Sequence, residues 1–345
     1  MSVAKFTALN QLTVGFALAA LLLTPACGQS STNSSSAPTL AAYFSDTSTF
    51  YVEHRVDADF LADLTEVYTP LRTELIAAGV ISEYDLPHNP LGSFDWWGML
   101  LMLTYDCSTL STFTIPFPDD YPNPLPSWMR SRIAVAGHSD PASDAFFPPT
   151  LFVFETSDRT QAAVFLDNDC IMIQDATKEE TANYTLYTGG YNVAALRDDV
   201  MFFSGDLADI PLEGVRAANL AQDSIFQTAL QNLPEDSYDA LFYLNGDDQD
   251  LLDDVFSGTA FEDVENAIRV IVLAGKIQAD GALIFDVLME TEPNRIEERS
   301  APRDQYIAEL VASLNGATTV TISVNEMETG ARGLILRRIT LSASE

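Results

Sequence analysis

The stretch RVIVLAGKIQADGALIFDVLM, residues 269–289, is the part of the sequence that says most about the fold. Residues 269–278 and 282–289 are two mainly apolar runs of strand length. Asp280-Gly281 stands between them, a pair typical of the two-residue turn of a β-hairpin. The stretch therefore predicts two antiparallel strands joined by a tight turn.

Strands and helices alternate on both sides of this hairpin. Upstream, residues 240–244 form an apolar run of strand length, followed by an acidic helical segment. Downstream, Ser300 is a helix cap, and the apolar spacing that follows predicts a helix ending at Gly316. Two final strands are expected, one around residues 320–324 and one at 334–341.

The first part of the chain shows a similar succession. It is expected to contain a strand at 50–56, a helix at 60–75 interrupted by Pro70, and a strand at 97–105. Further elements follow: a strand at 151–155, a helix capped by Ser157, strands at 184–187, 191–196 and 200–203, a helix opened by Pro211, and a helix capped by Asp223 or Ser224.

Both parts of the chain thus follow one order of strand, helix, strands, capped helix and hairpin. This order predicts an α+β fold of two similar units, each an antiparallel sheet with helices packed on one face. The first unit is expected at residues 40–219, with a proline-rich insertion at 115–149, and the second at 220–345. A chance similarity between common elements is the alternative.

The N-terminal residues indicate export from the cytoplasm. Lys5 precedes an apolar segment at residues 14–23, and Thr24-Pro25-Ala26-Cys27-Gly28 follows. A positive region, a short apolar segment and a small residue before the cut are typical of a signal peptide, here residues 1–26. The apolar segment is shorter than the roughly 20 residues that span a bilayer.

Cys27 directly after the predicted cut resembles a bacterial lipoprotein signal, in which the thiol is acylated. The Ser-rich residues 30–38 suit a flexible tether, so residues 27–39 are predicted to be a lipidated cysteine and its tether. No Asp follows Cys27, which by this resemblance implies the outer membrane, facing the periplasm or the surface. Ordinary cleavage, with Cys27 as a chance thiol, is the alternative.

Two further cysteines, Cys107 and Cys170, remain if Cys27 is lipidated. An even pair outside the cytoplasm predicts a disulfide. Each follows an aspartate rather than lying inside an apolar run, which favours the disulfide. Two buried free thiols are the competing interpretation.

The acidic net charge of the chain limits the classes of molecule it can bind. The chain has 345 residues, with 17 Lys and Arg against 50 Asp and Glu, a formal net charge of −33. Its hydrophobic share of 47% is enough for a folded core despite that charge. Nucleic acid is excluded as a partner because so few basic residues do not build a phosphate-binding face. The even spread of acidic residues indicates solubility in a salty setting.

Few residues suggest catalysis or metal binding. The three histidines, His54, His88 and His138, are expected on loops or the surface, and none stands at metal-ligand spacing with a cysteine. The acidic run at residues 245–254 lacks the glycine spacing of a calcium loop. We therefore expect no enzyme, no metal and no cofactor; a hydrolase with paired carboxylates is the alternative.

Aromatic residues gather in and beside the proline-rich region. Such side chains on loops can anchor a partner, or they can close the edge of a sheet. If a binding site exists, these residues are the candidates: Phe94, Trp96, Trp97, Trp128, Phe146 and Phe147.

One family resemblance emerges from packing and capping patterns. Residues 220–230, followed by Leu233-Pro234-Glu235-Asp236 and Phe242-Tyr243, resemble the central signature of a bacterial family known only as a domain of unknown function, number thirty-three fifty-two. Residues 155–166 and 193–204 resemble its neighbouring segments, and the similarity covers roughly residues 40–315. The resemblance implies an exported or membrane-anchored envelope protein and supplies no catalytic residues.

These observations lead to one expected function and two alternatives. We expect a lipid-anchored cell-envelope protein that works as a binding or scaffolding module and touches the membrane through acylated Cys27. Its partner would be another envelope protein or a small apolar ligand. The alternatives are an envelope carrier that holds an apolar ligand between sheet and helices, and the hydrolase mentioned above.

Overall fold

The computed structural model divides the chain into two compact units. Unit 1 takes in Asp59–Pro90 and Ser224–Glu345, and unit 2 takes in Pro38–Ala58 and Leu91–Asp223. The structure describes residues 40–57, 59–60, 66, 69, 73–74, 76–77, 127–138, 150–168, 170, 173, 175–189, 192–235, 238–246, 268–278, 282–291, 320–327 and 334–343.

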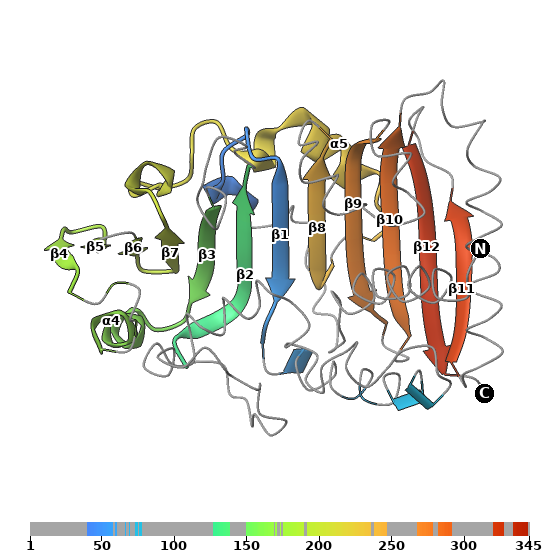
Figure 1. The fold of residues 1–345 in the computed structure, drawn as a ribbon, viewed down its shortest axis with the longest axis horizontal. Helices are drawn as coiled ribbons and strands as arrows, with labels where there is room; N and C mark the ends of the chain where they lie inside the picture. Colours follow the sequence, from blue (N-terminus) through green and yellow to red (C-terminus); the bar gives the residue numbers. More distant parts are fainter. Residues whose placement is uncertain are drawn as a thin grey trace, which may run out of the picture. The chain divides into compact units, whose positions relative to one another are not determined.

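The described part of unit 2 is built on an antiparallel sheet (Figure 1). The strand order is β1-β2-β3-β7-β6-β5-β4. The strands are β1 (Phe50–Arg55), β2 (Met129–Gly137), β3 (Thr150–Thr156), β4 (Thr177–Glu180), β5 (Thr185–Thr188), β6 (Val193–Leu196) and β7 (Val200–Ser204). The end strand β4 carries four exposed side chains, among them Lys178 and two glutamates, and such charged edges discourage pairing with other chains.

Both faces of the unit 2 sheet are covered. The helix α4 (Arg159–Asn168) buries Phe165 and Leu166 against one face. Residues 40–45 lie on the other face, where they include the 3-10 helix η1 (Ala41–Tyr43). The segment with the 3-10 helices η4 (Leu207–Asp209) and η5 (Leu220–Gln222) bonds to them, since the backbone N–H groups of Arg216 and Leu220 donate to the carbonyls of Ala42 and Phe44. Tyr43 and Phe202 meet edge to face there, with ring centroids 5.3 Å apart.

The described part of unit 1 is also built on antiparallel strands, in the order β11-β12-β10-β9-β8. Its strands are β8 (Ala240–Asn245), β9 (Ile268–Ile277), β10 (Leu283–Thr291), β11 (Val320–Met327) and β12 (Leu334–Ala343). The predicted hairpin at 269–289 is confirmed, because β9 and β10 pair antiparallel with Ile277 opposite Leu283. The helix α5 (Ser224–Gln231) precedes β8, and its Phe226 ring packs on Tyr243 with centroids 4.9 Å apart.

The described strands of the two units follow a similar order. In unit 2, β1, β2 and β3 are neighbours and the later strands β7 and β6 continue the sheet. In unit 1, β8, β9 and β10 are neighbours and β12 and β11 continue it. In both, the first strand carries a buried tyrosine that a phenylalanine from the preceding segment contacts edge to face, Phe44 on Tyr51 and Phe226 on Tyr243.

The predicted α+β class, with helices packed on one face of each sheet, is wrong. The described residues are mainly antiparallel sheet, with α4 and α5 as the named α-helices among them. The physical reason lies in strands such as β7, whose five side chains are all buried, so that both faces of the sheet need cover. In unit 2, irregular segments supply much of that cover where helices were expected.

Several local expectations also need correction. Asp158, not Ser157, caps α4, because its carboxylate accepts hydrogen bonds from the backbone N–H groups of Thr160 and Gln161. Pro211 opens no helix.

The expected strand at 97–105 and the expected helix at 300–316 lie outside the described residues. The described residues between 59 and 77 are helical, as expected.

Candidate functional site

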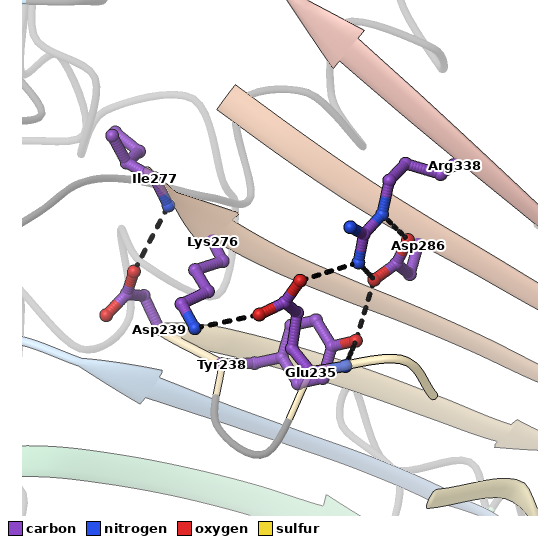
Figure 2. A network of polar contacts seen from close by, with 7 residues as sticks. All are labelled: Glu235, Tyr238, Asp239, Lys276, Ile277, Asp286 and Arg338. Atoms are coloured by element: carbon purple, nitrogen blue, oxygen red, sulfur yellow. Dashed lines mark hydrogen bonds and ion pairs between the residues drawn. The ribbon is translucent and has the colours of Figure 1, made fainter. Parts of the chain in front are cut away.

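A dense polar cluster in the described part of unit 1 lies on the sheet face that carries Asp286 (Figure 2). Three neighbouring strands contribute Lys276 from β9, Asp286 from β10 and Arg338 from β12. The segment between α5 and β8 contributes three more residues, Glu235, Tyr238 and Asp239. We call these six residues the polar network.

Asp286 is the centre of the polar network. It is fully buried, and its register partner on β12 is Arg338. The guanidinium of Arg338 donates two hydrogen bonds to this carboxylate, from Nε to Oδ1 and from Nη2 to Oδ2, each 2.8 Å long. Two parallel bonds of this kind are the strongest geometry an arginine–carboxylate pair offers. The pairing raises the pKa of Arg338, so this side chain stays charged.

Glu235 joins the network from the covering segment. Its carboxylate accepts hydrogen bonds from Nη2 of Arg338 at 2.9 Å and from Nζ of Lys276 at 3.1 Å. Partial burial of Glu235 would raise the pKa of its carboxyl, but the bonds from Lys276 and Arg338 outweigh it, and the pKa lies below its ordinary value. Glu235 is therefore an anion held between two cations.

Tyr238 links the same segment to the buried carboxylate. Its hydroxyl donates to Oδ2 of Asp286 at 2.7 Å and accepts from the backbone N–H of Glu235 at 3.1 Å. Burial and the neighbouring Asp286 raise the pKa of Tyr238, so the hydroxyl keeps its proton. Asp239 adds a further bond, accepting from the backbone N–H of Ile277 at 3.3 Å.

This geometry fastens a segment to a sheet and does not suit acid–base chemistry. A general acid needs a carboxyl with a raised pKa, whereas the pKa of Glu235 is lowered and Asp286 is engaged by Arg338 and Tyr238. Among the described residues, no three His, Cys, Asp or Glu side chains come together as a metal site.

Unit 2 contains a second buried carboxylate, Glu53 on β1, which is 2% exposed. It accepts hydrogen bonds from the hydroxyl of Tyr51 and the guanidinium of Arg132. The backbone N–H of Leu40 also donates to it, at 3.4 Å. Glu53 thereby ties the first described residue of the chain to the sheet.

Trp128 is the only one of the predicted aromatic binding residues that lies within the described part of the chain. It is 3% exposed, and its ring packs against Phe165 of α4 and Phe154 of β3, with centroids 5.1 and 6.1 Å away. Its indole therefore belongs to the packed interior of unit 2. The other candidates lie outside the described residues: Phe94, Trp96, Trp97, Phe146 and Phe147.

The predicted cysteine chemistry stays a prediction. Cys170 is buried just after the end of α4, and its backbone N–H donates a hydrogen bond to the carbonyl oxygen of Phe165. Cys107, its expected disulfide partner, lies outside the described residues, as does Cys27.

His54 lies in the strand expected at 50–56, but the expectation that it lies on the surface is wrong. His54 is in β1 and only 3% exposed. Burial lowers the pKa of its imidazole to about 3, so it is neutral in the folded protein near neutral pH. His138 is exposed, and His88 lies outside the described residues.

Sequence reasoning missed the polar network. Its charged members are far apart in the chain, since Glu235 and Arg338 are 103 residues apart. One signal was present: Asp286 interrupts the apolar run of β10, and a charge inside a buried strand requires a partner. The sequence alone does not say which of the arginines that partner is.

Comparisons with known proteins add little. No family model matches the chain, and no curated protein matches it. A solved structure titled "Structure of crystal form I of TP0453" is similar over 90% of this chain and 94% of that chain, at 8% sequence identity and a TM-score of 0.39. A match at that level assigns neither fold nor function.

No helix within the described ranges is both long and apolar enough to cross a membrane.

Replacing Tyr238 with phenylalanine is expected to lower the free energy of unfolding by about 1.5 kcal/mol, because a bond to a charged group is lost while Arg338 still pairs Asp286. Urea unfolding at pH 7 measures the change. The matched control is Tyr184→Phe at a partly exposed position, expected to change stability by less than about 0.5 kcal/mol. Equal effects of the two substitutions would contradict a role for the Tyr238 hydroxyl in fastening the segment.

Proposed function

We propose that this protein is a lipid-anchored protein of the bacterial cell envelope that works as a binding or scaffolding module. In this proposal residues 1–26 are a signal peptide, Cys27 carries the acyl chains, and residues 28–39 connect it to the folded units. The outer membrane, with the units facing the periplasm or the surface, is the proposed location.

The observation that carries the anchoring proposal is the boundary between tether and fold. The Ser-rich stretch ends at residue 38, and Leu40 is already buried, at 2% exposure. The backbone N–H of Leu40 donates a hydrogen bond to the carboxylate of Glu53, and the ring of Phe44 packs on that of Tyr51. A polar tether that leads directly into a buried attachment suits a domain held at a membrane.

The engagement of the buried ionisable groups supports binding rather than catalysis. Asp286 is paired with Arg338, Glu53 with Arg132, and the buried imidazole of His54 has its pKa far below neutrality. These groups serve the fold. When the buried charged groups of a protein are all engaged in holding its fold, its contacts with other molecules are made by its surface, which is what a binding module requires.

A fractionation experiment tests the anchoring. The full chain is expressed in a bacterium, and membranes are separated from soluble fractions. The wild-type protein is expected in the membrane fraction, because two or more acyl chains give stable anchoring. Cys27→Ala is expected to move it to the soluble or uncleaved pool.

Ser30→Ala is the matched control, because it changes the tether and leaves the thiol in place. It should stay with the membrane. If Cys27→Ala loses residues 1–26 and still partitions to the membrane as the wild-type chain does, the lipid anchor is refuted, whatever the protein binds.

A further inference from the structure

Two large apolar side chains stand in solvent on one segment of unit 2. Leu207 is 40% exposed and Val215 is 59% exposed, and both belong to residues 207–218, which we call the apolar loop. Further apolar residues of the loop are at least partly exposed as well: Pro211, Leu212, Ala217 and Ala218. Apolar groups gathered on a surface are typical of a contact with another molecule or with a membrane.

Hydrogen bonds fix the apolar loop on both sides of Val215. The carbonyl oxygen of Gly214 accepts a bond from Nη1 of Arg197 at 3.0 Å. On the other side, the backbone N–H of Arg216 donates to the carbonyl oxygen of Ala42 at 3.1 Å. Val215 is therefore held outward between two bonded neighbours, as contact residues on a fixed scaffold often are.

The side chain of Arg216 brings Leu207 to the same region. Its Nη2 donates hydrogen bonds to the carbonyl oxygens of Ala208 and Asp209, the two residues that follow Leu207 in η4. Leu207 and Val215 thus lie near opposite ends of one arginine, although they are separated in the chain.

The apolar loop carries little free charge. Residues 210–218 are neutral overall, because Glu213 is balanced by Arg216, whereas the whole chain has a formal net charge of −33. At the start of the loop, the carboxylate of Asp209 accepts a hydrogen bond from the hydroxyl of Ser204 at 3.1 Å. Anionic lipid headgroups repel an acidic surface and do not repel a neutral apolar one.

The proposed tether enters the fold beside the apolar loop. Leu40 is the first described residue, and the carbonyl of Ala42, two residues later, accepts the bond from Arg216. In the anchored protein, residues 28–39 separate Cys27 from Leu40 by at most about 40 Å, since a chain reaches at most about 3.5 Å per residue. This attachment keeps the apolar loop close to the bilayer.

From this placement we propose that the apolar loop rests on the membrane, with Leu207 and Val215 inserted among the headgroups of a lipid surface. The proposal rests on the anchoring through Cys27 proposed above and adds which face of unit 2 the membrane meets. A weak contact is enough, because the anchor holds the loop at a high local concentration near the lipid. The helix α4 packs on the opposite face of the sheet, so its exposed Val164 faces away from the bilayer.

The test measures tryptophan emission of the full chain in phosphatidylcholine vesicles, with and without bromine on the lipid acyl chains, because bromine quenches an indole that touches it. Val215→Trp adds an indole to the apolar loop, and we expect the added emission, relative to wild type, to fall about twofold in brominated lipid. Leu207→Trp should lose emission in the same way. Val164→Trp, at a similarly exposed apolar position on α4, is the matched control, and its added emission should not change.

Circular dichroism that matches the wild type shows that the three variants are folded. Unchanged emission at position 215 or 207, or an equal loss at position 164, would overturn the proposal. Sedimentation with the vesicles separates this failure from that of the anchor. A chain that sediments with the vesicles and is not quenched at position 215 keeps its anchor and loses only the membrane-facing loop. A chain that stays in solution refutes the anchor, and the proposed contact with it.

Discussion

Replacing Arg338 with alanine is expected to lower the free energy of unfolding by about 3–5 kcal/mol, the largest effect of any substitution considered. The reason is that Asp286 is fully buried and takes two of its bonds from this guanidinium. Without Arg338, the carboxylate has to lose its charge or draw water into the sheet, and both outcomes destabilise the fold. Denaturant unfolding followed by circular dichroism measures the loss.

Two companion substitutions make the expectation specific. Arg337→Ala changes the adjacent residue, whose side chain points to the other face of β12, and should cost less than about 1 kcal/mol. The double substitution Asp286→Leu with Arg338→Met removes both charges, and should recover much of the loss seen with Arg338→Ala. An Arg338→Ala loss no larger than that of Arg337→Ala would show that the pair does not hold the sheet.

His54 is expected to make the protein sensitive to mild acid. Its pKa in the folded chain is about 3, against about 6.5 when unfolded, so between these values the unfolded chain binds a proton that the folded chain does not. Stability is therefore fully present above about pH 6.5 and falls as pH drops, with a slope approaching about 1.4 kcal/mol per pH unit. The lowered pKa of Glu235 acts in the same direction at lower pH, where carboxyls titrate.

The measurement is the free energy of unfolding at a series of pH values between 7 and 5, in wild-type protein and in His54→Gln. The substitution removes the titrating group, so its profile should be flatter by about 1.4 kcal/mol per pH unit below pH 6. His138→Gln at an exposed position is the matched control and should keep the wild-type slope. Parallel profiles for wild type and His54→Gln would refute the role of the buried imidazole.

Local pattern predicted individual strands well and their assembly poorly. The hairpin at 269–289 was readable because a turn-forming pair separates two apolar runs, and the strand at β11 because its apolar residues alternate. Which segments cover which face depends on contacts between distant residues, so the fold class was misjudged.

The candidate site was hidden for a related reason. Asp286 is a charge within an apolar strand, but it was not singled out, and Glu235 and Arg338 look like ordinary surface charges among the 50 acidic and 17 basic residues of the chain. Only the register that places Arg338 opposite Asp286 reveals the pair. His54 is buried although its neighbours in β1, Glu53 and Arg55, are charged, and Glu53 is itself buried in an ion pair.

The intact mass of the full chain, extracted from membranes with detergent, tests the central claim of a lipid-anchored envelope protein most directly. The account predicts a polypeptide that starts at Cys27 and carries the added mass of acyl chains on that residue. A chain that retains its first 26 residues, or one that starts near Cys27 with no added mass, would contradict it.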